Sequence, residues 1–243
     1  MSERSPANAP DVTDLRWTLA QIAAIWGVSD IGFYLLPAAL GSPAGPGALS
    51  MALTIYYVFW VGISVITFWP LYGTWQLHVK WTTFENRFLA YAIWTLAFIG
   101  FVAFAVYIVP SLPKMDWRES WNPPEIVRAT EWYFLPKSID ILFQQLLVLA
   151  LVLALAARKY SIRRISLYVA VLFGGTHILL AFDGVPLGYI VRFGIAAAIF
   201  GAIFPHLILR VPNGMAYSYI VHWIYYAVSV VLPHIFLSKP LSA

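Results

Sequence analysis

The sequence contains seven apolar runs of about 20 residues each, which is the length of α-helix that crosses ~30 Å of hydrocarbon. They occupy residues 15–37, 49–70, 88–109, 137–157, 162–182, 187–209 and 215–236. Only 11% of the residues are charged, whereas roughly 25% is usual in a soluble domain. The pattern therefore predicts an all-α, polytopic membrane helix bundle with about seven transmembrane helices, embedded in a lipid bilayer.

The segments between these runs predict the helix ends and the domains. Thr13 or Asp14 is expected to cap the first helix, and Pro37 and Pro70 are expected to end the first and second. Pro124 opens a stretch, 124–134, that we interpret as a short interfacial helix. The expected parts are a polar N-terminal tail at 1–14, a three-helix part at 15–110, an interfacial connector at 111–136, a four-helix core at 137–237 and a C-terminal tail at 238–243.

Basic residues predict the orientation of the bundle. Seven crossings place nine Lys and Arg residues on the side of the N-terminus and six on the other. Arg158, Lys159, Arg163 and Arg164 lie in one short loop, and short loops dominate the positive-inside rule. We therefore expect a cytoplasmic N-terminus, with the bacterial inner membrane as the location. The net charge of +4 fits headgroup contact, and we expect no nucleic-acid partner.

Two kinds of residue inside the spans predict how the helices pack. Small residues at 194, 197, 198 and 201 lie four apart in pairs, which lets helix backbones approach closely and predicts a central, tightly packed sixth span. Asp30, Asp140, Gln144, Gln145, His177 and His222 are polar residues within the spans. Since polar groups are costly in hydrocarbon, we expect them to meet in one interior cavity.

Each of these polar residues has a structural and a functional interpretation. Asp140 and Gln144 are four apart and share a helix face, but Lys137 is close enough to neutralise Asp140. His177 and His222 are either neutral histidines that hydrogen-bond to a backbone carbonyl or residues of a functional site. The histidines, with Asp30 or Asp140, are a possible metal set, although their spacing does not require a metal and we assign none. The cofactor is undetermined, and none is required.

Known catalytic motifs narrow the choice of reaction. The sequence has no HExxH, no GxSxG and no glycine-rich phosphate loop. It also contains no cysteine, which excludes disulfides, thiolate metal sites and a cysteine nucleophile.

Residues 139–226 resemble the family of CAAX prenyl proteases and bacteriocin-processing membrane proteins, the CPBP or ABI family. Its pattern is EExxxR on one helix, FxxxH on the next, then a small-residue helix and a final histidine motif. Phe173 and His177 match FxxxH, and His222 matches the final histidine. Gln144 and Gln145 replace the two glutamates, Leu149 replaces the arginine, and Tyr226 replaces the usual asparagine.

The resemblance implies an intramembrane endopeptidase fold in which a glutamate activates water and the two histidines assist. A glutamine amide cannot accept a proton at neutral pH, so the chain is expected to be a catalytically impaired member. It would act as a binding or accessory subunit for a membrane peptide or partner membrane protein. On this interpretation His177, His222 and Asp140 are the candidate catalytic residues. The candidate binding residues are Asp30, Gln144, Gln145, Phe173 and Tyr226.

Two other functions stay open at this point. One is an active intramembrane protease that uses another carboxylate, such as Asp30, Glu131 or Asp140. The other is a membrane subunit whose histidines hold a haem, a pigment or a metal.

Overall fold

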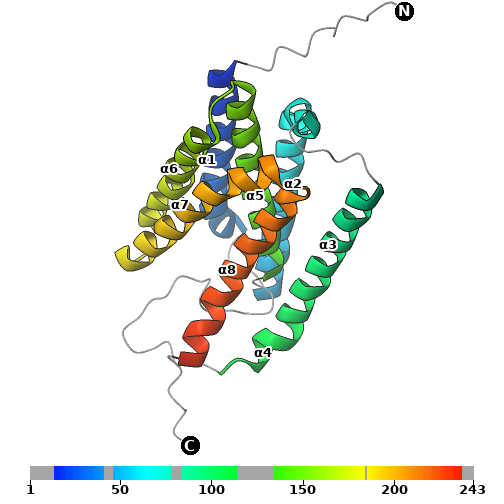
Figure 1. The fold of residues 1–243 in the computed structure, drawn as a ribbon. Helices are drawn as coiled ribbons and strands as arrows, with labels where there is room; N and C mark the ends of the chain where they lie inside the picture. The colour runs from blue at the N-terminus through cyan, green and yellow to red at the C-terminus, as the bar shows by residue number, and fades with distance from the viewer. Residues whose placement is uncertain (1–13, 41–45, 78–83, 114–133, 184, 237–243) are drawn as a thin grey trace, which may run out of the picture.

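The computed structural model describes residues 14–40, 46–77, 84–113, 134–183 and 185–236, and these form a bundle of long helices (Figure 1). The α-helices are α1 (Leu15–Leu40), α2 (Pro46–Gly73), α3 (Phe84–Ala103), α4 (Val109–Ser111), α5 (Phe134–Ala157), α6 (Ile162–Thr176), α7 (Leu187–Arg210) and α8 (Gly214–Phe236). The 3₁₀ helices η1 (Thr74–Leu77) and η5 (His177–Asp183) extend α2 and α6, and a π-helical turn η2 (Phe104–Ile108) joins α3 to α4. The all-helical class predicted from the apolar runs is thus confirmed.

Six of the described helices are long and apolar enough to cross a membrane: α2, α3 with its extension, α5, α6 with its extension, α7 and α8. The chain is therefore an integral membrane protein. The first predicted span, α1, is not among the six. At 26 residues it is nevertheless long enough, and it packs within the same bundle. The long helices run in alternate directions, so α1 begins and α8 ends at opposite ends of the bundle (Figure 1).

The predicted cap of the first helix is confirmed, whereas the predicted helix ends at Pro37 and Pro70 are wrong. Asp14 caps α1, since its carboxylate accepts a hydrogen bond from the backbone N–H of Arg16 at 3.1 Å. Pro37 and Pro70 lie inside the last turns of α1 and α2 instead of ending them. Proline is tolerated there because neighbouring helices and local adjustment satisfy the freed backbone groups in a membrane protein. The predicted interfacial helix at 124–134 lies almost wholly outside the described residues, with only Phe134 described, as the first residue of α5.

Helix α5 lies at the centre of the bundle and contacts α1, α2, α6, α7 and α8 (Figure 1). From Phe143 to Leu155 every residue except Gln144 is buried. The predicted three-helix part therefore packs against the first helix of the predicted four-helix core, and the domain division itself stays a prediction.

The small residues of α7 allow it to pack tightly against α6. A Cβ atom added to Gly201 would lie 2.6 Å from the Cα of Ala170, and one added to Gly174 would lie 3.0 Å from the Gly194 carbonyl oxygen. The predicted tight packing is confirmed, but the predicted central position is wrong. Helix α5 takes that position, since it is the helix that contacts α1, α2, α6, α7 and α8.

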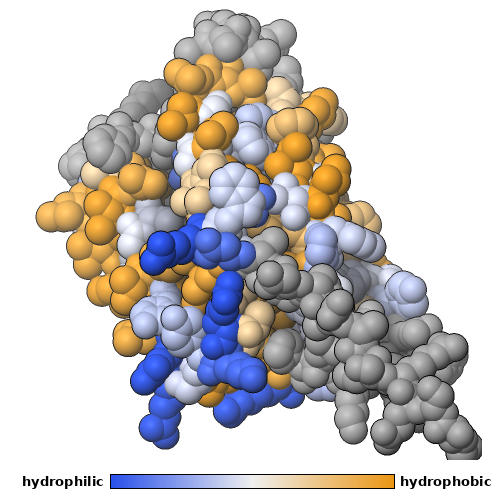
Figure 2. All heavy atoms as spheres, turned by 90° about the horizontal axis from the view of Figure 1, so that it is seen from above, coloured by the Kyte–Doolittle hydropathy of each residue, from blue (hydrophilic) through white to orange (hydrophobic). Residues whose placement is uncertain are grey.

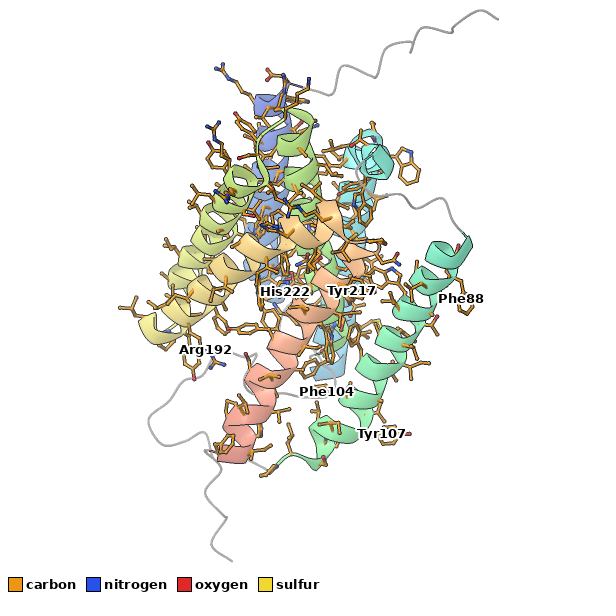
Figure 3. The ribbon with its side chains drawn as sticks, in the orientation of Figure 1. Phe88, Phe104, Tyr107, Arg192, Tyr217 and His222 are labelled. Atoms are coloured by element: carbon orange, nitrogen blue, oxygen red, sulfur yellow. The ribbon has the colours of Figure 1, made fainter. Side chains whose placement is uncertain are left out.

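Helix α3 lies at the edge of the bundle and is held by aromatic rings (Figure 1). Phe101 stacks on Trp223 of α8 with ring centroids 4.0 Å apart, and Phe104 packs edge-on against the same indole at 5.2 Å. On the outer side, Phe88 and Tyr107 point away from the bundle and are 66% and 73% exposed (Figure 3). Such a surface suits contact with lipid chains.

Hydrophilic side chains gather at the end of the bundle where α1 begins and α5 joins α6 (Figure 2). Five basic residues at this end are exposed, and none of them forms an ion pair within the described part of the chain. They are Arg16, Arg158, Lys159, Arg163 and Arg164. This end of the bundle is therefore a basic surface next to an apolar belt.

Candidate functional site

The first turns of α5 carry a partly buried ion pair. The ammonium of Lys137 lies 2.7 Å from an oxygen of Asp140, and the amide of Gln144 donates a hydrogen bond to the other oxygen at 3.0 Å. The spacings of three and four residues place all three side chains on one face of the helix. The Lys137 ammonium also lies 4.3 Å from the centre of the Tyr226 ring of α8. Asp140 is thus already bound by two neighbours, as expected from its closeness to Lys137.

Gln145 joins α5 to α8 through two hydrogen bonds. Its carbonyl oxygen accepts from the Ser218 hydroxyl at 3.0 Å, and its amide nitrogen lies 3.1 Å from Nδ1 of His222. Gln145 and Ser218 are completely buried, and His222 is 2% exposed. The Ser218 hydroxyl also lies 2.8 Å from the Met215 carbonyl oxygen, so its single proton is shared between two acceptors. Nδ1 is the His222 ring nitrogen that contacts the Gln145 amide.

His177 begins η5 directly after α6, so its ring projects from a helix end. Its Nδ1 lies 3.0 Å from the carbonyl oxygen of Phe173. A carbonyl only accepts, so Nδ1 carries the proton and Nε2 of the neutral ring is an acceptor. The Phe173 ring packs edge-on against both histidines, with ring centroids 5.6 Å from His177 and 5.7 Å from His222. His222 is further enclosed by aromatic rings of α7 and α8.

Asp30 approaches this region from α1. Its carboxylate interacts electrostatically with Asp140 and Lys137, and it accepts a hydrogen bond from the Trp26 side chain one turn earlier. The Trp26 ring in turn packs edge-on against Phe173, with centroids 5.9 Å apart. Helix α1 therefore contributes a second carboxylate to the same part of the bundle.

The structure brings together the side chains that the sequence analysis singled out, from α1, α5, α6, η5 and α8. His177 interacts electrostatically with Lys137 and Asp140, and His222 does so with Lys137 and His177. Figure 3 shows His222 inside the body of the bundle. We refer to these residues as the polar cluster. Its members are Asp30, Lys137, Asp140, Gln144, Gln145, His177, Ser218, His222 and Tyr226.

Ser218 and Trp26 belong to this network and were missed in the sequence. Ser218 lies four residues before His222 on the same helix face, which is a signal that could have identified it. Trp26 lies four residues before Asp30, but a tryptophan in an apolar run gives no comparable signal. Glu131, the remaining carboxylate suggested for catalysis, lies outside the described residues.

The geometry limits the chemistry of the polar cluster. Within the described part of the chain, no group of three or more histidine, cysteine, aspartate or glutamate side chains is arranged to hold a metal ion. The histidine nitrogens that make hydrogen bonds there contact an amide and a backbone carbonyl. Neither contact is with a carboxylate, so neither supplies the acid–base pair that activates a nucleophile.

These features define a class of protein: an integral membrane helix bundle with a buried polar cluster around its central helix. No family model, curated protein or solved structure matches the chain.

Proposed function

We propose that the chain is a CPBP-like integral membrane protein that binds a membrane peptide or a partner membrane protein at the polar cluster, and that it does not cleave its ligand. The observation that carries this proposal is the state of Gln145. Both ends of its side chain are used in hydrogen bonds, to His222 and Ser218. At the position where the resemblance leads us to expect a catalytic glutamate, the chain has a neutral amide that holds two helices together.

The neighbouring carboxylate supports binding over hydrolysis. A general base needs a lone pair that is free to take a proton from water. Asp140 is held by the Lys137 ammonium at 2.7 Å and by the Gln144 amide at 3.0 Å. Proton uptake by Asp140 would break this pairing, so an active protease based on Asp140 is disfavoured. The enclosure of His222 by Gln145 and aromatic rings likewise disfavours haem ligation, because a flat macrocycle would have to displace them.

The proposal is tested with purified protein in phospholipid nanodiscs and fluorescent single-span hydrophobic peptides. We expect energy transfer from the protein's tryptophans to a bound peptide, and intact peptide by mass spectrometry after prolonged incubation. His222→Phe removes the contact with Gln145 that joins α5 to α8, at nearly constant bulk, and should abolish binding by disturbing the polar cluster. Ile199→Ala, at a position 53% exposed on the outer surface of α7, is the matched control and should bind normally.

Two results would contradict this function. Peptide cleavage by the wild-type protein that His222→Phe abolishes would favour the protease alternative. Failure of every peptide to bind the wild-type protein would remove the binding function.

We also infer that the N-terminus faces the cytoplasm and that the protein resides in a bacterial inner membrane. The exposed basic surface at the α5–α6 loop supports this orientation through the positive-inside rule. The chain has no cysteine, so Ser161→Cys, in that loop, creates a unique thiol. A membrane-impermeant maleimide should label it only after the cytoplasmic side is opened, and labelling of intact spheroplasts from outside would reverse the assignment.

A further inference from the structure

The polar cluster contains an uneven set of hydrogen-bonding groups. In the part of the chain that the structure describes, one ion pair is present, between Lys137 and Asp140. Asp30 interacts electrostatically with both of these residues but pairs with neither within 4 Å. The described cluster therefore contains two carboxylates and one ammonium, and the ammonium is already held by Asp140.

A second observation points in the same direction. The side-chain oxygen of Gln144 is inaccessible to solvent and accepts no hydrogen bond from the described residues, although its amide nitrogen is bonded to Asp140. An unpaired acceptor in a membrane interior is costly. The Nε2 lone pair of His177 is a further acceptor, because Nδ1 donates to the Phe173 carbonyl.

We propose that the polar cluster binds the protonated primary amine of its membrane ligand, between Asp30 of α1 and Gln144 of α5. This inference rests on the proposed binding function and names the ligand chemistry. An ammonium group would supply a positive charge that Asp30 does not pair with among the described residues, and N–H donors for the acceptors on Gln144 and His177. The Trp26 side chain interacts with Asp30, and the Tyr226 ring already lies 4.3 Å from the Lys137 ammonium; aromatic faces of this kind attract cations. Lysine side chains, free peptide N-termini and long-chain amines share this chemistry.

The experiment compares dodecylammonium with dodecanol, which has the same chain and no charge, in nanodiscs of zwitterionic lipid. Retention by protein-loaded discs, corrected for empty discs, is measured by equilibrium dialysis. We expect the wild-type protein to prefer the ammonium by roughly tenfold or more, since hydrogen bonds to charged groups are the strong ones. Asp30→Asn should remove the preference and Asp30→Glu should keep it. Asp14→Asn, at the exposed start of α1, is the matched control and should also keep it.

A second comparison, of dodecyltrimethylammonium with dodecylammonium, separates charge from hydrogen bonding. It needs only the wild-type protein, so it tests the proposal even if Asp30→Asn fails to fold. Dodecyltrimethylammonium has the charge but no N–H, and it should bind more weakly than dodecylammonium. Any of three results would overturn the proposal. The wild-type protein could retain dodecylammonium and dodecanol equally, or retain the two ammonium ions equally. A folded Asp30→Asn variant could also keep the preference unchanged.

A peptide comparison separates this inference from the proposed function. A hydrophobic peptide with an acetylated N-terminus and no lysine or arginine is compared with the same peptide bearing a free amine. Tighter binding of the free amine supports the proposal. If both bind equally, the amine inference fails and the binding function stands. If neither binds, both fail.

Discussion

The hydrogen bond between Gln145 and His222 can be measured by a double-mutant cycle. Gln145→Leu removes its bonds to His222 and Ser218, at 3.1 and 3.0 Å, and replaces the amide with an apolar chain of similar size. The Ser218 hydroxyl can then donate its one proton to the Met215 carbonyl oxygen, 2.8 Å away, so only Nδ1 of His222 loses its partner. His222→Phe reverses the situation and leaves the Gln145 amide without an acceptor. The double variant removes both partners.

The expected magnitudes follow from the burial of the pair. Interhelical hydrogen bonds in membrane proteins are worth about 0.6 kcal/mol on average and up to about 1.7 kcal/mol. A buried polar group left unpaired costs about 1–3 kcal/mol. Gln145→Leu should therefore destabilise the protein by about 2–4 kcal/mol, and His222→Phe by about 1–3 kcal/mol. The double variant should be more stable than their sum predicts, by a coupling of about 1–2 kcal/mol.

Stability is measured by reversible unfolding in mixed micelles of dodecyl maltoside and dodecyl sulfate, followed by tryptophan fluorescence. The control cycle pairs Gln144→Leu with His222→Phe. Gln144 is the adjacent amide but is bonded to Asp140, so the two effects should add to within about 0.5 kcal/mol. A coupling below about 0.5 kcal/mol for the Gln145 pair would show that this hydrogen bond does not form, and the argument from Gln145 against catalysis would fail with it.

Three further outcomes are expected in the same micelles. Gly201→Ala should destabilise by about 1–3 kcal/mol, because its Cβ would meet the α6 backbone at 2.6 Å. Gly62→Ala, with open space around it, should instead stabilise by about 0.5–1 kcal/mol, and equal effects at the two positions would refute the close approach. Lys137→Met should cost about 3–5 kcal/mol by leaving Asp140 unpaired, and adding Asp140→Asn should restore most of it; no restoration would show that the pair is not the cause. Phe101→Ala should weaken the attachment of α3 by about 1 kcal/mol, seen as faster hydrogen exchange in α3 alone, whereas uniform exchange along the chain would contradict an edge position.

The helices were predictable because hydrophobic length is a strong signal, and every predicted span corresponds to a helix. The ends were less predictable. Pro37 and Pro70 are strong breakers in water, but a membrane bundle tolerates them within a last turn. The fifth span changes from α-helix to 3₁₀ helix at His177, just after Gly174 and Gly175, which weaken an α-helix but do not predict what replaces it.

The position of each helix in the bundle was harder to predict, because it depends on which faces meet. The glycines and alanines around Gly201 correctly predicted close packing but not that α5 would be central. Gln145 and His222 were predictable as polar residues of the spans that share one interior region. Their direct hydrogen bond was not, because side-chain direction depends on helix rotation, which composition does not determine.

The separation of Gln145 from its partners along the chain has a consequence for biosynthesis. Ser218 and His222 follow it by 73 and 77 residues, so they are still unmade when α5 leaves the ribosome. At about 5–20 residues per second, the interval lasts roughly 4–15 s. During this time the newly inserted helix presents its glutamine to lipid or to the insertion machinery. A charged side chain at that depth would cost about 2.5–3.5 kcal/mol on insertion. An uncharged amide lowers the free-energy cost of inserting α5 before α8 is present.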